Sequence, residues 1–134
     1  MTEPTVLFLC VHNAGRSQMA LAWFQHLGRD IATAYAGGSE PAAQLNPVVV
    51  EAMREVGIDI ASAIPKRWTD DDIKRVDVVI TLGCGDECPY FPGTRYEDWP
   101  VPDPAGLPLD EIRPIRDEIE ARVRDLIDRL AAST

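Results

Sequence analysis

Short, unbroken runs of apolar residues alternate along this chain with segments that repeat apolar residues at helical spacing. A continuous apolar run without alternation is typical of a strand buried on both faces. Strands that alternate with helices favour an α/β fold, a parallel sheet covered by helices on both sides. The predicted order is strand, helix, strand, helix, helix, strand, strand, helix, at residues 6–9, 17–28, 32–36, 46–57, from 69, 76–82, 95–99 and from 114.

Capping residues mark several predicted boundaries. Asn46 and Pro47 supply an N-cap followed by proline at the first helical position, and Thr69 precedes three aspartates that favour a helix start. Pro114 is predicted to open the last helix, whose apolar stripe continues to Leu130. The charged residues on the other side of that helix are expected only to face solvent.

Size and charge exclude several classes of protein. The 134 residues suffice for a single domain over residues 1–134, and 46% apolar with 26% charged residues is a normal soluble balance. No apolar run approaches the ~20 residues that span a bilayer, and residues 1–5 lack the basic start of a signal peptide. The net charge of −9 argues against nucleic acid or an anionic membrane as partner. We therefore expect a cytoplasmic monomer.

A candidate oxyanion loop, Cys10-Val-His-Asn-Ala-Gly-Arg16-Ser17, separates the first strand from the first helix. Such a loop can direct successive backbone N–H groups at a tetrahedral oxyanion, and the following helix adds its positive end. Arg16 offers a planar pair of donors to two substrate oxygens. A cysteine in these positive surroundings is favoured as a thiolate, so Cys10 is the predicted nucleophile.

The other loop residues have predicted supporting roles. Gly15 permits a backbone arrangement that a side chain would hinder, Ser17 can donate a hydrogen bond to the Cys10 sulfur, and Asn13 can brace the loop. His12 is not needed as a base, because the loop is already rich in donors. The alternative to a catalytic loop is that Cys10 is a buried structural cysteine and Arg16 a surface arginine. The predicted substrate-binding residues are Val11, His12, Asn13, Ala14, Gly15, Arg16 and Ser17.

The reaction also needs an acid, because a leaving oxygen must take up a proton. Asp103 lies in the segment Trp-Pro-Val-Pro-Asp-Pro, where prolines on both sides restrict its backbone. Asp98 and Asp110 are rivals without that restriction. We therefore predict Asp103 as the general acid.

Together these motifs resemble the low-molecular-weight protein tyrosine phosphatase superfamily. Within it, the segment V-H-N-A-G-R-S-Q-M-A, Ala36-Gly37, Asn46-Pro47 and D-P-A-G at 103–106 resemble the arsenate reductase branch, over essentially the whole chain. The resemblance implies a three-layer α/β/α fold with a four-stranded parallel sheet. It also implies that Cys10 is the nucleophile, Arg16 the oxyanion-binding arginine and Asp103 the acid.

Two further cysteines, Cys84 and Cys88, distinguish the branch. A cysteine count of three is a poor framework for structural disulfides, and in a reducing compartment thiols are more often catalytic, redox-active or metal-binding. On a helical turn, residues four apart have Cα atoms about 6 Å apart, within disulfide range. A zinc site is disfavoured, since no second Cys/His pair with suitable spacing accompanies them.

The resemblance to thioredoxin-coupled arsenate reductases implies that Cys84 attacks the Cys10 sulfur and that arsenite then leaves. Cys88 next attacks Cys84, which forms a Cys84–Cys88 disulfide. Thioredoxin reduces the resulting disulfide, and no tightly bound cofactor is expected. Three residues separate Cys84 from Cys88 here, fewer than in many such relatives. Mycothiol or glutathione therefore stays open as the reductant. A phosphatase and a non-enzymatic redox-sensing or anion-binding module are the other hypotheses.

Overall fold

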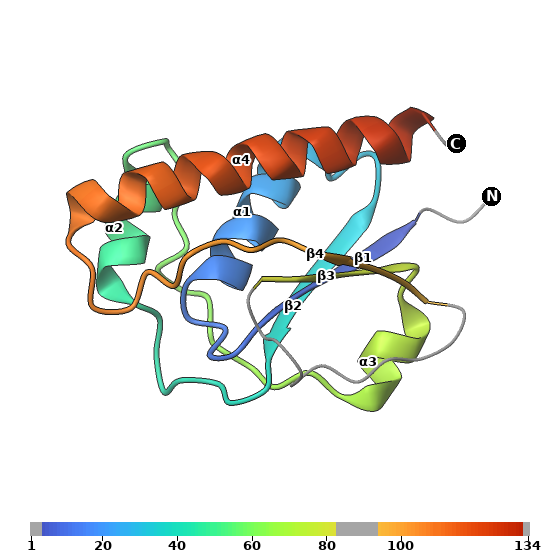
Figure 1. Ribbon diagram of the computed structural model, residues 1–134, viewed down its shortest axis with the longest axis horizontal. Coiled ribbons are helices and arrows are strands. Elements are labelled where there is room, and N and C mark those ends of the chain that lie inside the picture. The colour runs from blue at the N-terminus through green and yellow to red at the C-terminus, as the bar shows by residue number, and fades with distance from the viewer. Residues whose placement is uncertain (1–3, 83–93, 133–134) are drawn as a thin grey trace.

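The computed structural model describes residues 4–82 and 94–132. Their helices and strands follow the predicted order (Figure 1). The elements are β1 (Thr5–Cys10), α1 (Arg16–Gly28), β2 (Thr33–Gly38), α2 (Pro47–Arg54), α3 (Asp70–Arg75), β3 (Val78–Thr81), β4 (Arg95–Asp98) and α4 (Leu109–Ala132).

The four strands form one parallel sheet in the order β2-β1-β3-β4. Helices α1, α2 and α4 lie on one side of this sheet, and α3 lies on the other (Figure 1). The predicted α/β class, the four parallel strands and the three layers are therefore confirmed. The predicted strand at 95–99 corresponds to β4, which lies at an edge, because it pairs only with β3 within the described sheet.

Alternate residues of β1 serve two separate cores, as strand geometry requires. Val6 and Phe8 pack with α1 and α4, whereas Leu7 and Leu9 pack with Ile73 of α3. Every one of these side chains is 2% exposed or less. The first strand is thus fixed on both faces, which holds its carboxyl end in place for the loop that follows.

The start of α4 was predicted wrongly. The helix begins at Leu109, and Pro114 lies inside it rather than at its first position. Pro108 accepts hydrogen bonds from the N–H groups of Glu111 and Ile112, so it closes the first turn. Starting the helix at Leu109 buries Ile112 completely and extends the apolar stripe. This burial offsets the loss of the backbone hydrogen bond that Pro114 cannot donate.

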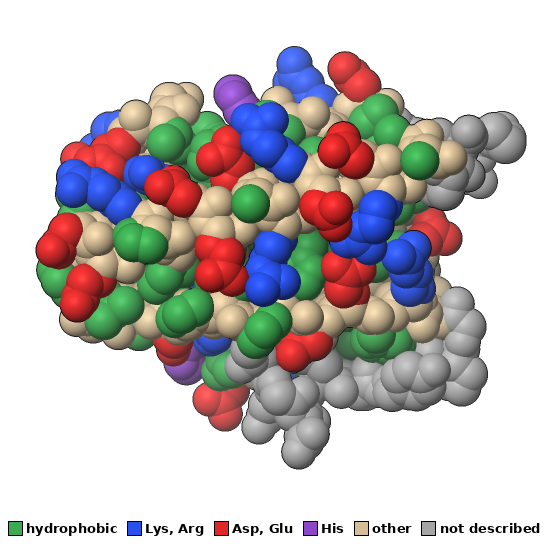
Figure 2. All heavy atoms as spheres, turned by 45° about the horizontal axis from the view of Figure 1, so that its top comes forward, with side chains coloured by type: hydrophobic (Ala, Val, Ile, Leu, Met, Phe, Trp, Pro, Cys, Tyr) green, Lys and Arg blue, Asp and Glu red, His purple; other side chains and the backbone are tan. Residues whose placement is uncertain are grey.

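Ion pairs join α4 to its neighbours and line its exposed side. Figure 2 shows acidic and basic side chains interspersed over this face, and i,i+4 pairs such as Arg122–Glu118 account for part of the pattern. Arg129 reaches Glu97 of β4 and, by hydrogen bonding, lowers the pKa of that carboxyl.

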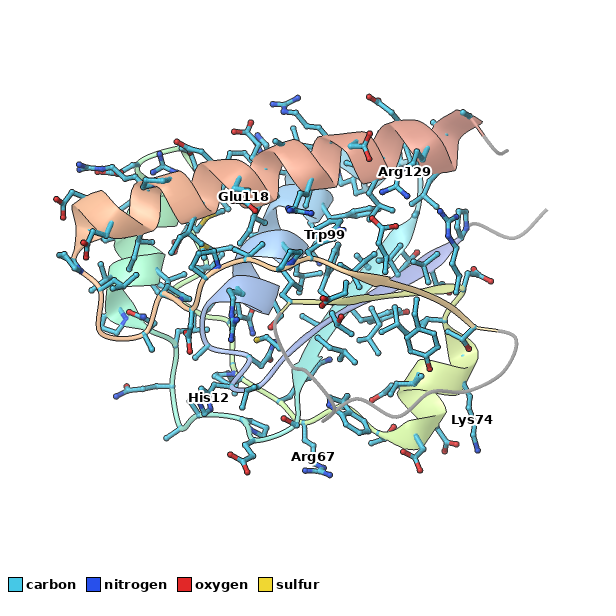
Figure 3. The ribbon with its side chains drawn as sticks, viewed as in Figure 1. His12, Arg67, Lys74, Trp99, Glu118 and Arg129 are labelled. Carbon is cyan, nitrogen blue, oxygen red and sulfur yellow. The ribbon has the colours of Figure 1, made fainter. Side chains whose placement is uncertain are left out.

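Trp99, at the end of β4, is buried between α4 and the sheet (Figure 3). Among the described residues, no helix has the length and apolar content needed to cross a bilayer.

Candidate active site

The Cys10 sulfur sits at the carboxyl end of β1 and has polar contacts with Ser17 and Asn13. The side chain is 2% exposed, its Sγ lies 2.9 Å from Ser17 Oγ, and the Asn13 backbone N–H donates to it over 3.2 Å. The arrangement of these contacts matches that expected around a nucleophilic cysteine.

The loop after Cys10 is held from outside through its carbonyl groups. In a trans peptide the N–H points opposite to the C=O, so a carbonyl bonded outward directs the next N–H inward. The N–H of Asn13 obeys this rule, since it reaches the Cys10 sulfur. The outward bonds span 2.8 to 3.3 Å and run from the N–H groups of Ser39, Glu40, Ala42 and Asn46 to the carbonyls of Cys10, Val11, His12 and Ala14.

This arrangement produces an anion cradle from backbone alone. By the same rule, the N–H groups of residues 11, 12 and 15 are directed away from the segment at 39–46, and α1 begins with Arg16 directly behind them. Partial positive charges from these amides and from the helix N-terminus converge beside the sulfur. The sequence did not indicate that residues 39–46 bind the oxyanion loop, because no local pattern shows which carbonyls they reach.

Asn13 has the left-handed backbone conformation, with φ 51°. Asparagine tolerates this region better than most residues. Its side chain, fully buried, bonds Ser17, Gln18 and the backbone N–H of Lys66. The bracing role predicted for Asn13 thus has a geometric basis, and Gln18 and Lys66 are partners that the sequence did not indicate.

Arg16 and Asp103 meet at the mouth of the loop. Arg16 is 8% exposed and donates to the Val101 carbonyl over 3.2 Å, while its Nη2 lies 3.8 Å from Asp103 Oδ2. The Asp103 side chain is half exposed and is also fixed by the Ala105 N–H. Pro104, next to it, packs on Gly15, where an added Cβ would lie 2.7 Å from Pro104 Cγ. The glycine at 15 therefore allows the acid-bearing loop to approach the oxyanion loop.

A cavity of about 240 Å³ opens where these groups converge. Cys10, Arg16 and Asp103 all line it, as do Gln44 and Asn46 from the segment that binds the loop. Of the predicted substrate-binding residues, His12, Ala14 and Gly15 also line it, whereas Val11, Asn13 and Ser17 do not. His12 belongs to the loop (Figure 3), is exposed, and donates from Nδ1 to the Glu40 carbonyl.

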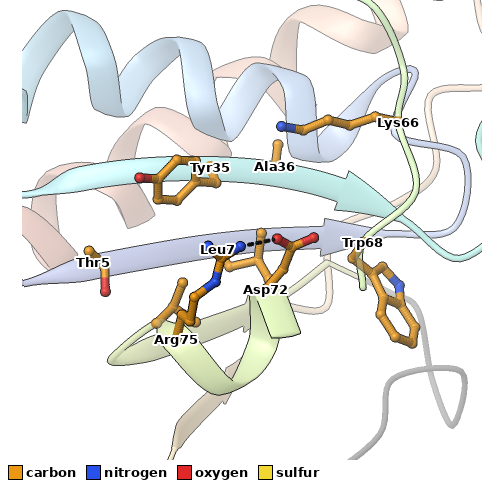
Figure 4. A pocket seen from close by; sticks show the side chains of 9 residues that line it. Thr5, Leu7, Tyr35, Ala36, Lys66, Trp68, Asp72 and Arg75 are labelled. Carbon is orange, nitrogen blue, oxygen red and sulfur yellow. Dashed lines mark hydrogen bonds and ion pairs between the residues drawn. The ribbon is translucent and has the colours of Figure 1, made fainter. Parts of the chain in front are cut away.

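A second cavity, of about 210 Å³, lies between β2 and α3 on the opposite side of the sheet (Figure 4). The Asp72–Arg75 ion pair, 2.8 Å long, borders it. Burial opposes ionisation of Asp72, but hydrogen bonds from Thr69 and Arg75 outweigh it and lower the pKa. None of the predicted catalytic residues in the described part of the chain lines this cavity.

The predicted resolving cysteines, Cys84 and Cys88, lie outside the described residues. The chain leading to them is placed: the Leu82 N–H donates to the Leu9 carbonyl over 2.7 Å. Position 82 is therefore adjacent to the end of β1, at the same edge of the sheet as Cys10. Within residues 4–82 and 94–132, no group of three His, Cys, Asp or Glu side chains is arranged to hold a metal ion.

A buried thiol at a strand end, a loop held through its carbonyl groups and an arginine at the helix start are the features that the sequence predicts for an oxyanion-binding loop. The sequence profile of the family described as low molecular weight phosphotyrosine protein phosphatase matches residues 5–134. The chain belongs to this family, and the resemblance predicted from the sequence is confirmed.

Within the family the chain is similar to proteins named arsenate reductase. One from Staphylococcus aureus is 38% identical over 133 residues, covering 96% of this chain and all of the relative. The structure of a thioredoxin-dependent arsenate reductase from Corynebacterium glutamicum is 42% identical with a TM-score of 0.82, covering all of this chain but 64% of that longer one. An arsenate reductase in the phosphate binding state is 33% identical, with a TM-score of 0.81 and 95% and 98% of the two chains covered.

Proposed function

We propose that this protein reduces arsenate to arsenite through a covalent adduct on Cys10. The observation that carries the proposal is the shared cavity, into which a hydrogen-bonded sulfur, the buried Arg16 and the carboxylate of Asp103 all open. The similarity to arsenate reductases at 38% identity over nearly the whole chain supports the choice of substrate.

In the first step the cradle N–H groups and Arg16 hold the arsenate oxygens. The Cys10 thiolate attacks arsenic and forms an S–As bond, and one oxygen leaves as water after taking a proton from Asp103. Because charge develops on oxygens that already face fixed donors, no reorganisation is needed as the adduct forms. Asp103 fits the acid's role because it lines the cavity, whereas its rivals Asp98 and Asp110 do not.

Two thiols then supply the two electrons. Cys84 attacks the Cys10 sulfur, an S–S bond forms, and the S–As bond breaks with its electron pair going to arsenic, which leaves as arsenite. Cys88 attacks Cys84 and frees the Cys10 thiolate, and thioredoxin reduces the Cys84–Cys88 disulfide. The contact of Leu82 with Leu9 supports this relay, since it starts the Cys84 segment beside Cys10. Thiols kept reduced imply a cytoplasmic setting.

A phosphatase would use the same cradle and acid, so the cavity wall must discriminate. Ala42 and Ala105 line the cavity, and in the described chain the His12 imidazole is the only aromatic side chain that does so. A phosphotyrosine ring needs an apolar or aromatic platform, whereas a bare oxyanion does not. The wall thus favours arsenate over an aryl phosphate.

The test is NADPH oxidation by the full chain with thioredoxin reductase, thioredoxin and arsenate. We expect turnover that disappears in Cys10→Ser and falls by about 10²–10⁴ in Asp103→Asn. Asp110→Asn removes a similar charge from the exposed first turn of α4 and is the matched control. Rapid aryl-phosphate hydrolysis without arsenate-dependent oxidation would assign the phosphatase instead.

The reductant is settled by a second comparison. Mycothiol or glutathione, each with its own reductase, replaces thioredoxin in the same assay. With the internal relay, Cys84→Ser and Cys88→Ser both abolish thioredoxin-driven turnover. Turnover with a small thiol that survives in both variants would show that the external thiol attacks the adduct.

A further inference from the structure

Gln18 is a buried polar side chain that the proposed chemistry does not itself use. It lies in the first turn of α1, is 5% exposed, and donates from Nε2 to Asn13 Oδ1 over 3.1 Å. Leaving a buried amide without a partner is costly, so the pairing with Asn13 is a strong constraint on both side chains.

The orientation of the Asn13 amide can be assigned from chemistry. An amide oxygen and nitrogen exchange places on a half-turn, and only the hydrogen-bond partners distinguish them. The Lys66 backbone N–H lies 3.0 Å from one of these atoms and can only donate, so that atom is the oxygen. Gln18 supplies a second donor to the same oxygen. Both acceptor positions of Asn13 Oδ1 are then filled, and Nδ2 is turned toward Ser17.

The direction of the next hydrogen bond follows. Asn13 Nδ2 donates to Ser17 Oγ over 2.6 Å, so this oxygen acts there as an acceptor. Ser17 has one hydroxyl hydrogen, and within residues 4–82 and 94–132 the other side-chain partner of its Oγ is Cys10 Sγ at 2.9 Å. The hydroxyl therefore donates to the sulfur. With the amide turned over, Oδ1 would accept that hydrogen and the sulfur would lose it.

We propose that Gln18 is a positioning residue that holds the Asn13 amide in the orientation that aims the Ser17 hydroxyl at Cys10. Two intervening side chains transmit the effect, so Gln18 stabilises the thiolate without touching it or the substrate. The inference deepens the proposed function and rests on Cys10 being its nucleophile. Its test needs no arsenate, so it gives a result even if arsenate turnover is not found.

The test measures alkylation of Cys10 by iodoacetamide, followed by mass spectrometry of the Cys10 peptide in the full chain between pH 6 and 10. Gln18→Glu keeps the shape but replaces the donor with an acceptor, and Gln18→Met removes the donor without adding charge. Gln25→Glu adds the same charge on an exposed position of α1 and is the matched control.

At pH 6.5 we expect Gln18→Glu to slow alkylation three- to tenfold and Gln18→Met about twofold, with Gln25→Glu unchanged. Losing a hydrogen bond to a charged sulfur lowers the thiolate fraction by more than these rate factors. The thiolate that remains is more basic and therefore more nucleophilic, which offsets part of the loss in alkylation rate. The rates should therefore converge or cross at high pH. A uniform loss at every pH would indicate a distorted loop and would overturn the proposal.

Ser17→Ala provides the decisive background, because it removes the hydroxyl that Gln18 is proposed to aim. Both Gln18 variants should leave the alkylation rate of Ser17→Ala unchanged, as expected for residues acting through one chain of contacts. Equal slowing with and without Ser17 would refute the proposal. If Gln18→Glu fails to fold by circular dichroism, Gln18→Met decides: an alkylation profile identical to the native one would show that the Lys66 N–H suffices.

Discussion

Gly15→Ala probes the contact between the acid-bearing loop and the oxyanion loop. The added Cβ would lie 2.7 Å from Pro104 Cγ and 3.7 Å from Val49 Cγ2. Carbon atoms in contact prefer separations of roughly 3.5–4.0 Å, so Pro104 must retreat by about 1 Å. Overpacking of this kind costs about 1–3 kcal/mol of stability.

The effect on turnover should exceed the effect on stability. Asp103 precedes Pro104 and lies 3.8 Å from Arg16 Nη2, so the retreat carries the acid away from the cavity. A misplacement of about 1 Å in a catalytic group can lower the rate by about 10²-fold. We expect arsenate-dependent NADPH oxidation to fall by roughly this factor, with Cys10 alkylation unchanged because the sulfur's own contacts are retained.

Two comparisons make this prediction sharp. Gly57→Ala strains a residue with φ 83° in open space beyond α2, so it should cost about 1 kcal/mol without changing turnover. Pro104→Ala removes the clashing atom, and the Gly15→Ala/Pro104→Ala double variant should therefore be less destabilised in urea than the two single effects sum to. Strictly additive losses, or native turnover in Gly15→Ala, would show that the contact with Pro104 is not why glycine is needed.

Three other outcomes can be checked. Arg16→Lys should lower kcat/KM for arsenate about 10²–10³-fold, since a point charge cannot replace two coplanar donors. Ile119→Ala, at a fully buried position of α4, should lower the free energy of unfolding by about 2–5 kcal/mol in urea titrations. Hydrogen bonds from Arg113, then Arg116, lower the pKa of Glu55 from 4.5 to about 2. The stability that ionised Glu55 provides is thus present above pH 4.5 and lost as the pH falls through 2. Glu55→Gln should accordingly differ from the native protein in urea at pH 7 and converge with it toward pH 2; a constant difference across this range would contradict the assignment.

The predictions that held rest on local patterns. Val6–Leu9 has a continuous apolar run, and β1 is buried on both faces. Asn46 caps α2 through its side chain, and Thr69 forms a capping box with Asp72. The wrong start of α4 came from weighing Pro114 as a local signal, when burial of Ile112 decides the boundary. Gly15 was predicted for its backbone freedom, and the structure adds a second reason for glycine here, since its close approach to Pro104 leaves no room for a Cβ.

The sequence alone determined the strand, loop and helix that bring Cys10, Arg16 and Ser17 together, because these residues are neighbours and their geometry follows from local propensity and periodicity. Tertiary structure alone decided what surrounds them: which carbonyls residues 39–46 bind, that Lys66 reaches Asn13 from 53 positions away, and that Asp103 closes on Arg16. Contacts between distant segments depend on how the whole sheet closes and packs, and no local stretch of sequence encodes that outcome.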